Sequence, residues 1–509
     1  MADDKKVRVR FAPSPTGGLH LGGVRTALFN YLFAKKNKGT FVLRIEDTDQ
    51  SRFVEGAEEY INNCLAWCGI EPDESPTKGG EYGPYRQSER KVSYRQYAEQ
   101  LVSAGYAYYC FDTPEELEEQ RKLTPNFKYS HENRIGLRNS LTLEAGETKA
   151  LLAAETAHVI RLKVLPDETL SLHDMIRGTV SFETSLVDDK VLLKADGMPT
   201  YHLAAVVDDY KMKISHVFRG EEWLPSAPIH ILLWEYLGWK NEMPEWVHLP
   251  LILKPDGNGK LSKRDGERLG FPVFAMNWQD SPEGELVKGF REMGFLPEAF
   301  INMLALLGWN SGTEQEIFTK EELIEAFTLE RVSKSGAKFD FEKAKWFNHE
   351  WIKAMSADEL SVHINPVLAH HGIFNADSAH VNKVIDLVKE RLTFIEEFWE
   401  HASFFFKEPE VYDMSSIKSK WNEDKTNFFV NLIDQLTGYE PWHAESLEVF
   451  YKLAIEASGM KMGELMLPLR IMLVGGKFGP HVFDIAAVLG KEETIARIKK
   501  GLKILLESE

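Results

Sequence analysis

The chain has 509 residues, enough for several domains, and 43% of them are hydrophobic, which suffices for ordinary globular cores. Its net charge of −18 argues weakly against a nucleic-acid partner, although net charge says little about a local face. Three cysteines argue against a disulfide scaffold, no apolar run reaches membrane-spanning length, and the first residues lack the apolar core of a secretion signal, so a cytoplasmic location is expected.

The start of the chain predicts a strand-to-helix turn. Residues 7–11 alternate apolar and charged side chains, as a strand does. Apolar residues from Leu21 to Leu32 recur at helical spacing, and a helix is expected near 21–36. Two prolines stiffen the turn, and its glycines allow close backbone approach. His20 falls at the first helical turn, where free backbone N–H groups and the helix dipole attract phosphate. An ordinary turn with a surface histidine explains this stretch about equally well.

Predicted strands and helices continue to alternate up to residue 111, which indicates a doubly wound α/β fold. A strand over 40–45 ends at Glu46-Asp47-Thr48-Asp49, on the sheet edge where such sheets bind ligands, although an acidic turn that caps the next helix explains these residues better by themselves. Cys64 and Cys68 are interpreted as buried small hydrophobes, because zinc would need more ligands than lie near them. The remaining elements of this part are helices over 54–68 and 88–104 and a strand over 106–111.

From 112 to 200 the pattern is mixed and predicts an insertion between two halves of a nucleotide-binding sheet. The insertion holds an acidic helix that starts at Pro114 and strands over 159–164 and 191–194. Alternation then resumes with a strand over 214–219, a helix over 224–237 and a strand over 246–253.

A polar, glycine-flanked loop follows at 254–266. It carries three cations within five residues, Lys260, Lys263 and Arg264. Such a loop can close over a triphosphate and neutralise its charge, but seen alone a solvated basic loop is the simpler interpretation.

Helical patterns dominate from about residue 290, with a nearly all-apolar helix expected over 300–309. Cations interleaved with aromatic residues over 331–354 suit an RNA backbone and stacked bases, and further basic residues follow in 463–500. Without other evidence, a charged helical surface explains both segments better. The cations are Arg331, Lys334, Lys338, Lys343 and Lys345, then Arg470, Lys491, Arg497, Lys499 and Lys500.

Taken in order, these stretches resemble class I aminoacyl-tRNA synthetases. The resemblance rests on the Pro-Ser-Pro-Thr-Gly turn, the helix start His20-Leu21-Gly22-Gly23 and the distant loop Lys260-Leu261-Ser262-Lys263-Arg264. More narrowly, the chain is similar over nearly its whole length to bacterial glutamyl-tRNA synthetases. The stretches that carry this similarity are 10–17, 44–49, 83–90, 206–209, 339–343 and 468–470.

The chain departs from this family at three places. Gly23 replaces a second histidine and cannot donate to a phosphate, and Ala205 stands where some members have asparagine near the substrate. Some members hold zinc in the insertion, but only Cys110 is available here, so no zinc is expected.

The resemblance implies an α/β fold, with a class I Rossmann-like catalytic domain, an inserted α+β connective domain and an all-α anticodon-binding region. The implied ranges are 1–111 and 201–253 for the two catalytic halves, 112–200 for the connective insertion that binds the acceptor stem, 254–335 for a stem-contact domain with the Lys-Leu-Ser-Lys-Arg loop, and 336–509 for the helical anticodon-binding region.

The activity that the resemblance implies is glutamate–tRNA ligation. The α-carboxylate of L-glutamate attacks the α-phosphate of ATP, with Mg²⁺ bridging phosphates, and the acyl group then passes to the 3′ end of the tRNA for Glu. Neither step needs a protein nucleophile, so positioning and charge stabilisation should do most of the work. Activation of glutamate is expected to need tRNA.

The site residues that the resemblance implies fall into three groups. They are His20, Lys260, Lys263 and Arg264 for catalysis, Arg10, Ala12, Ser14, Glu46, Tyr201 and Arg219 around glutamate, and His20, Glu222, Leu251, Ile252 and Lys263 for ATP.

Several alternatives stay open. The enzyme could also charge the tRNA for Gln. A glutaminyl-tRNA synthetase is disfavoured because that relative is expected to carry β-barrels in place of the helical C-terminal region. An RNA-binding protein without catalysis is disfavoured by the presence of His20 and Lys263, and a truncated paralogue that modifies tRNA would lack the helical half. A monomer without a membrane partner is expected.

Overall fold

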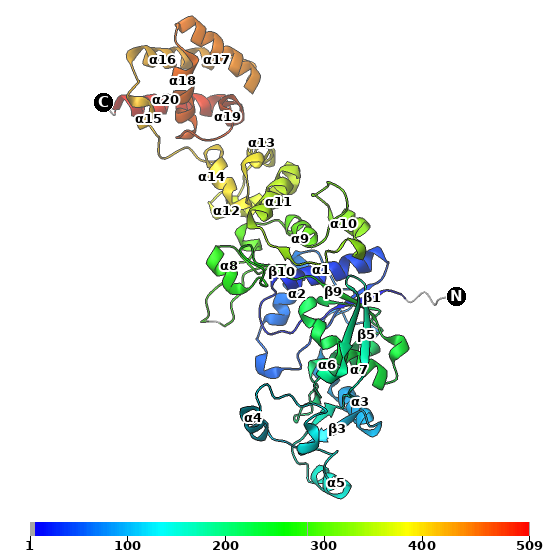
Figure 1. The fold of residues 1–509 in the computed structure, drawn as a ribbon. Coiled ribbons are helices and arrows are strands. Elements are labelled where there is room, and N and C mark those ends of the chain that lie inside the picture. The colour runs from blue at the N-terminus through cyan, green and yellow to red at the C-terminus, as the bar shows by residue number, and fades with distance from the viewer. Residues whose placement is uncertain (1–5, 282, 508–509) are drawn as a thin grey trace. The chain divides into compact units, whose positions relative to one another are not determined.

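The computed structural model describes residues 6–281 and 283–507, which fall into two compact units (Figure 1). Unit 1 comprises the chain up to Met293 together with Pro297–Phe341, and unit 2 comprises Gly294–Leu296 and the chain from Glu342. Within the described ranges, no helix is both long enough and apolar enough to span a membrane.

Unit 1 is built on a six-stranded sheet with the order β2-β1-β8-β9-β5-β6. All neighbouring strands are parallel except β6, which is antiparallel to β5. The strands are β1 (Arg8–Phe11), β2 (Thr40–Leu43), β5 (Thr169–Asp174), β6 (Gly178–Glu183), β8 (His216–Gly220) and β9 (Glu245–Leu249). Because parallel sheets bind ligands at the carboxyl ends of their strands, the residues that follow β1, β2, β8 and β9 are candidates for a ligand site.

The helices in the described part of unit 1 match the sequence prediction only in part, because those at 145–153, 201–211, 263–269 and 320–326 are absent from it and the helix expected over 300–309 lies at 297–306. They are α1 (Leu21–Lys36), α2 (Ala57–Trp67), α3 (Lys91–Ser103), α4 (Pro114–Leu123), α5 (Ala145–Ala153), α6 (Tyr201–Lys211), α7 (Ala227–Tyr236), α8 (Lys263–Leu269), α9 (Pro297–Leu306) and α10 (Lys320–Ala326). The side chains of Cys64 and Cys68 are 0% and 2% exposed, which confirms that they act as small hydrophobes.

The strand expected over 106–111 forms, but the prediction that it continues the doubly wound sheet is wrong. It is β3 (Ala107–Cys110) and pairs antiparallel with β4 (Val159–Leu162) in a separate three-stranded sheet, which β7 (Val191–Leu193) completes. An apolar run predicts a strand from local residues alone and carries no information about the partner strand.

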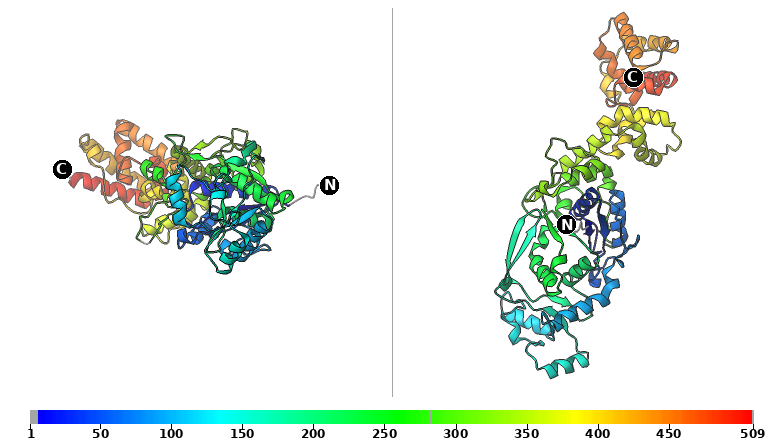
Figure 2. Two further views of the ribbon diagram at one scale, coloured as in Figure 1. Left: turned by 60° about the horizontal axis from the view of Figure 1, so that its bottom comes forward. Right: turned by 90° about the vertical axis from the view of Figure 1, so that its right-hand side faces the viewer.

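The hairpin of β5 and β6 is absent from the sequence prediction. Its backbone runs as a long ribbon along one side of unit 1 (Figure 2), and β5 pairs in parallel with β9 at Asp174 and Trp246. A segment between β4 and β7 of the smaller sheet therefore returns to the main sheet. This return places Asp174, the last residue of β5, beside β9.

The strand expected over 246–253 is in fact two strands. β9 ends at Leu249, and β10 (Ile252–Leu253) pairs with β11 (Ala337–Lys338) in a sheet of its own. Pro250 lies between them, and proline has no N–H group to continue a sheet ladder. The buried Arg25 of α1 donates through Nη2 to the carbonyl oxygen of Pro250, which fixes this break against the helix.

The described part of unit 2 is helical, as predicted. Its helices are α11 (Phe341–Ala354, whose first residue belongs to unit 1), α12 (Ala357–His370), α13 (Ser378–Val388), α14 (Phe398–Ala402), α15 (Ser415–Lys418), α16 (Glu423–Thr437), α17 (Ala444–Ser458), α18 (Met462–Val474), α19 (Val482–Leu489) and α20 (Lys491–Glu507). Two of the predicted surface cations serve packing instead. Arg497 is 3% exposed and donates to the carbonyl oxygen of Leu473 at 2.7 Å, and Arg470 donates to three carbonyl oxygens of the turn after α18.

His216, at the start of β8, makes the stability of the fold depend on pH. Burial lowers the pKa of its imidazole to about 4 from 6.5. Between these values the unfolded chain binds a proton on this ring and the folded chain does not, so acidification destabilises the fold. Lowering the pH from about 7 to about 5 should reduce the free energy of unfolding of both proteins. We expect this reduction to be about 2 kcal/mol smaller in His216→Gln than in the parent protein, as measured by urea titration. Equal losses in both proteins would show that His216 does not carry this effect.

Candidate active site

A cavity of about 960 Å³ opens at the carboxyl ends of β1, β8 and β9, beside the start of α1. All the predicted site residues line it except Lys263 and Arg264. The lining members of the predicted set are Arg10, Ala12, Ser14, His20, Glu46, Tyr201, Arg219, Glu222, Leu251, Ile252 and Lys260. Ala205, by contrast, is buried in α6 and does not line the cavity.

His20 is the N-cap of α1, and its ring Nδ1 accepts a long hydrogen bond of 3.5 Å from the N–H of Gly22. Burial and then the nearby Lys260 lower the pKa of His20 to about 4. The ring is therefore neutral at pH 7, and because Nδ1 accepts, its proton lies on Nε2. Nε2 is buried and has no hydrogen-bond partner among the described residues. It is thus a donor available to an anion in the cavity.

The prediction of free amides at the start of α1 is wrong, because the N–H of Gly22 donates to the ring of His20, the N–H of Gly23 donates to the carbonyl oxygen of His20 at 2.8 Å, and the first residue also has a partner. The N–H of Leu21 donates to the carbonyl oxygen of Val273 at 2.9 Å. Gly18 permits the close approach of this later segment, because a Cβ atom there would lie 2.6 Å from Cγ of Trp278 and 2.9 Å from Cε1 of Phe274. The partner of Leu21 comes from more than 250 residues downstream, so the local pattern around His20 could not show it.

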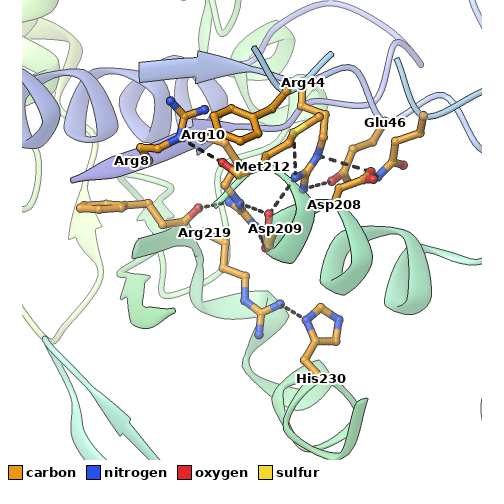
Figure 3. Close-up of polar contacts among 12 residues, drawn as sticks. Arg8, Arg10, Arg44, Glu46, Asp208, Asp209, Met212, Arg219 and His230 are labelled. Atoms are coloured by element: carbon orange, nitrogen blue, oxygen red, sulfur yellow. Dashed lines mark hydrogen bonds and ion pairs between the residues drawn. The ribbon is translucent and has the colours of Figure 1, made fainter. Parts of the chain in front are cut away.

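Arg10 and Glu46 of the cavity lining belong to a buried network of charged side chains that also includes Arg44, Asp208 and Asp209 (Figure 3). Oδ1 of Asp209 accepts from Nε of Arg10 at 3.0 Å and from Nη1 of Arg44 at 2.8 Å. Arg44 also donates from Nη2 to Oε1 of Glu46 at 3.0 Å. Burial by itself would raise the pKa of Asp209, but the two arginines lower it, whereas burial raises the pKa of Glu46. The network fixes Arg10 and Glu46 at the cavity.

Sequence reasoning gave Arg44 and Asp209 no role in the site. The only signal was their occurrence as charges inside apolar stretches, Arg44 directly after β2 and Asp209 within α6. Both side chains are almost fully buried, with exposures of 0% for Arg44 and 5% for Asp209. Buried charges need partners, so such charges in apolar stretches predict an internal ion pair but not which residue completes it.

Arg219 in β8 is held by three neutral partners. Nε donates to Nε2 of His248 at 2.9 Å, and Nη1 donates to the hydroxyl oxygen of Tyr201 at 3.1 Å and to Nδ1 of His230 at 3.5 Å. Figure 3 shows its guanidinium group turned toward His230. The remaining nitrogen, Nη2, is buried and has no hydrogen-bond partner among the described residues. Since Arg219 lines the cavity, this end of the guanidinium is suited to an anionic ligand.

The predicted catalytic cations are dispersed. Lys263 and Arg264 begin α8, which Ser262 caps, and neither lines the cavity. Nζ of Lys263 pairs with Oδ2 of Asp280 at 3.0 Å, and Arg264 is exposed. Lys260 does line the cavity, where its ammonium pairs with Glu222.

Cys110 lies in a hydrogen-bonded cluster of the insertion. Its Sγ donates to Oδ2 of Asp112 at 3.3 Å and accepts from Nε of Arg161 at 3.4 Å, while the hydroxyl of Tyr129 donates to the same Asp112 oxygen at 2.9 Å. Across residues 6–281 and 283–507, no group of three or more His, Cys, Asp or Glu side chains is placed to hold a metal ion. The expected absence of zinc stays a prediction.

Comparison with known proteins gives concordant matches over the whole chain. Residues 6–346 match the family of tRNA synthetases class I (E and Q), catalytic domain, and residues 345–502 match an anticodon binding domain. The chain is 53% identical over 503 residues to a glutamate–tRNA ligase of Phocaeicola vulgatus, covering 99% of both chains. It is 53% identical over 505 residues to that of Flavobacterium johnsoniae, covering 98% of this chain and 100% of the relative. A crystal structure of a glutamate tRNA ligase from Elizabethkingia meningosepticum in complex with its amino acid has 49% identity and a TM-score of 0.93, covering 98% of this chain and 100% of that one.

Proposed function

The chain belongs to the class I tRNA synthetases for glutamate and glutamine, and from this premise we propose which parts of its cavity bind glutamate and which bind ATP. It is a glutamate–tRNA ligase, in line with relatives of that activity that match it along its full length. In this proposal the predicted residues divide between the glutamate and the ATP that the activity requires.

The observation that carries the assignment is that Arg219 lines the cavity and that its Nη2 is buried with no hydrogen-bond partner among the described residues. We assign the side-chain carboxylate of glutamate to this nitrogen and to the hydroxyl of Tyr201, whose oxygen already accepts from Arg219 and so leaves its proton for the ligand. Glu46 suits the ammonium group. Arg10 lines the same cavity but is anchored by two hydrogen bonds to Asp209, and we assign it to the α-carboxylate side of the pocket, with Ala12 and Ser14.

ATP occupies the part of the cavity near α1 in this proposal. The adenosine lies by Glu222, Leu251 and Ile252, and the Nε2 proton of His20 and the ammonium of Lys260 face the phosphates. When bound with ATP, Mg²⁺ would neutralise part of the charge on the phosphates.

The reaction then runs in two displacements. An α-carboxylate oxygen of glutamate attacks the α-phosphorus and pyrophosphate leaves, after which a ribose hydroxyl of the terminal adenosine attacks the acyl carbon and AMP leaves. The chain supplies orientation and charge stabilisation for both steps. The monomeric state and the cytoplasmic location stay predictions.

Aminoacylation of purified tRNAs for Glu and Gln tests this assignment. We expect glutamate to be joined to the tRNA for Glu and glutamine to be joined to neither. Glutamate on the tRNA for Gln would identify an enzyme that does not discriminate between the two tRNAs. Efficient charging with glutamine would overturn the assignment of Arg219.

Binding of tRNA is expected to weaken steeply with salt despite the net charge of −18. Exposed cations in 331–354 and 470–500 displace counterions from phosphates, so affinity should fall by orders of magnitude between about 50 and 200 mM salt. Fluorescence titration at several salt concentrations measures the slope. Lys338→Ala should reduce the slope by about one unit, whereas Lys240→Ala, an exposed lysine outside both segments, should not. An affinity that stays flat across the titration would contradict the idea.

A further inference from the structure

The strand β5, which the sequence prediction missed, brings the carboxylate of Asp174 close to Arg219. His248 lies between them and forms a hydrogen bond with each. Asp174 and His248 are both fully buried. Oδ2 of Asp174 accepts from Nδ1 of His248 at 2.7 Å and from its backbone N–H at 3.0 Å. Oδ1 accepts from the backbone N–H groups of Ile176 and Arg177 at 3.0 and 2.9 Å. Both oxygens of the carboxylate are therefore committed as acceptors.

This arrangement fixes the tautomer of His248. A carboxylate can only accept, so the ring proton lies on Nδ1. Burial is the main cause that lowers the pKa of His248, so the ring stays neutral and Nε2 carries a lone pair. That lone pair accepts from Nε of Arg219 at 2.9 Å. The opposite tautomer would set a ring N–H against the N–H of Arg219.

We propose that Asp174 and His248 are positioning residues that set the preference for glutamate over glutamine by fixing the guanidinium of Arg219 in the orientation that presents Nη2 to the cavity. The inference rests on the proposed function, in which Arg219 holds the side-chain carboxylate. Neither residue lines the cavity, and the hydrogen bond between Arg219 and His248 links both of them to a residue that does. At metal sites, residues that hydrogen-bond to the ligands commonly change affinity or activity by about 10- to 100-fold, and we expect an effect of this order for residues that hold Arg219.

Asp174→Asn tests the proposal. An asparagine keeps one acceptor oxygen for the backbone N–H groups of Ile176 and Arg177, and its NH₂ group then faces the ring of His248 and also the backbone N–H of His248, which loses its acceptor. The ring then accepts at Nδ1 and carries its proton on Nε2, facing Arg219. We expect KM for glutamate to rise and the glutamate-to-glutamine ratio of kcat/KM to fall, each by about tenfold, while KM for ATP stays within about twofold of the parent value.

A second variant distinguishes an effect of the His248 tautomer from a general effect of Asp174→Asn on the fold. His248→Gln can place Oε1 where Nε2 of the ring stood, as an acceptor that needs no help from Asp174. In that background Asp174→Asn should no longer change the glutamate-to-glutamine ratio, because residues that act through one another are not additive. A ratio that falls by the same factor in both backgrounds would overturn the proposal.

Asp189→Asn is the matched control. Asp189 is also fully buried and accepts from Tyr108 and Arg134, and among the described residues no hydrogen bond joins it to Arg219 or to the partners of Arg219. Its loss should lower the melting temperature and leave the glutamate-to-glutamine ratio unchanged.

The ¹⁵N NMR signals of the histidine rings give a readout that needs no activity, with the His248 signals identified by their loss in His248→Gln. We expect the Nδ1–H form in the parent protein and the Nε2–H form in Asp174→Asn. An unchanged ratio in a folded Asp174→Asn protein with the switched tautomer would refute the positioning role. Failure of the parent protein to charge tRNA with glutamate would instead refute the proposed function.

Discussion

Replacing Lys263 with alanine is expected to slow glutamate activation by about two to three orders of magnitude, although Lys263 does not line the cavity. Its ammonium is held by Asp280 in a pair whose side chains are 37% and 61% exposed. Exposed pairs of this kind contribute only about 0–1 kcal/mol, so the phosphates of bound ATP can replace Asp280 as the partner. A cation that meets the departing pyrophosphate then lowers the barrier by about 2.7–4 kcal/mol.

ATP–pyrophosphate exchange in the presence of tRNA measures this effect. Arg268→Ala is a matched control, because Arg268 is a half-exposed cation of the same helix whose partners are Asp256 and Asp265. It should exchange at close to the parental rate. Asp280→Ala should also stay active, since it releases Lys263 from its resting partner. A Lys263→Ala protein with near-normal exchange would show that this lysine only pairs with Asp280.

Elements that depend only on a local residue pattern could be predicted from the sequence. The apolar periodicity of α1 predicted both of its ends, the alternation of apolar and charged residues predicted β1, and short runs rich in apolar residues predicted β2 and β8. The hairpin of β5 and β6 could not be predicted in the same way, because its partner β9 lies about 70 residues away. Whether β3 belongs to the main sheet or to the insertion was equally out of reach, since pairing depends on distant strands.

The same distinction applies to the site. The predicted residues that follow strand ends reach the cavity because parallel strands share one carboxyl edge, as Glu46 and Arg219 illustrate. The groups that hold them, such as Asp174 behind His248, come from strands that are neighbours only in the folded chain. Ion pairs formed by flexible side chains, such as Lys263 with Asp280, leave no periodic signal at all.

Arg219→Gln is expected to raise KM for glutamate by about 10- to 100-fold and to remove most of the preference over glutamine. A charge-assisted hydrogen bond contributes about 1.5–3 kcal/mol, which corresponds to this range for one lost contact. In the parent protein a glutamine ligand would set its NH₂ group against the N–H groups of Arg219, and this mismatch carries the discrimination. Steady-state charging kinetics with both amino acids give the ratio, and KM for ATP should change little.

The stability of the ligand-free protein provides an independent check on Arg219. Its guanidinium is buried, and its partners Tyr201, His230 and His248 are neutral, so burial lowers its pKa without a directly bonded carboxylate to offset the cost. Arg219→Gln removes that buried charge and should melt at a temperature equal to or above that of the parent protein. At the same concentration, glutamate should then raise the melting temperature of the variant less than that of the parent protein, because the variant lacks the ion pair to the side-chain carboxylate. If the variant keeps its preference for glutamate, Arg219 does not read the side chain, and Arg10, anchored by Asp209, becomes the group that must do so.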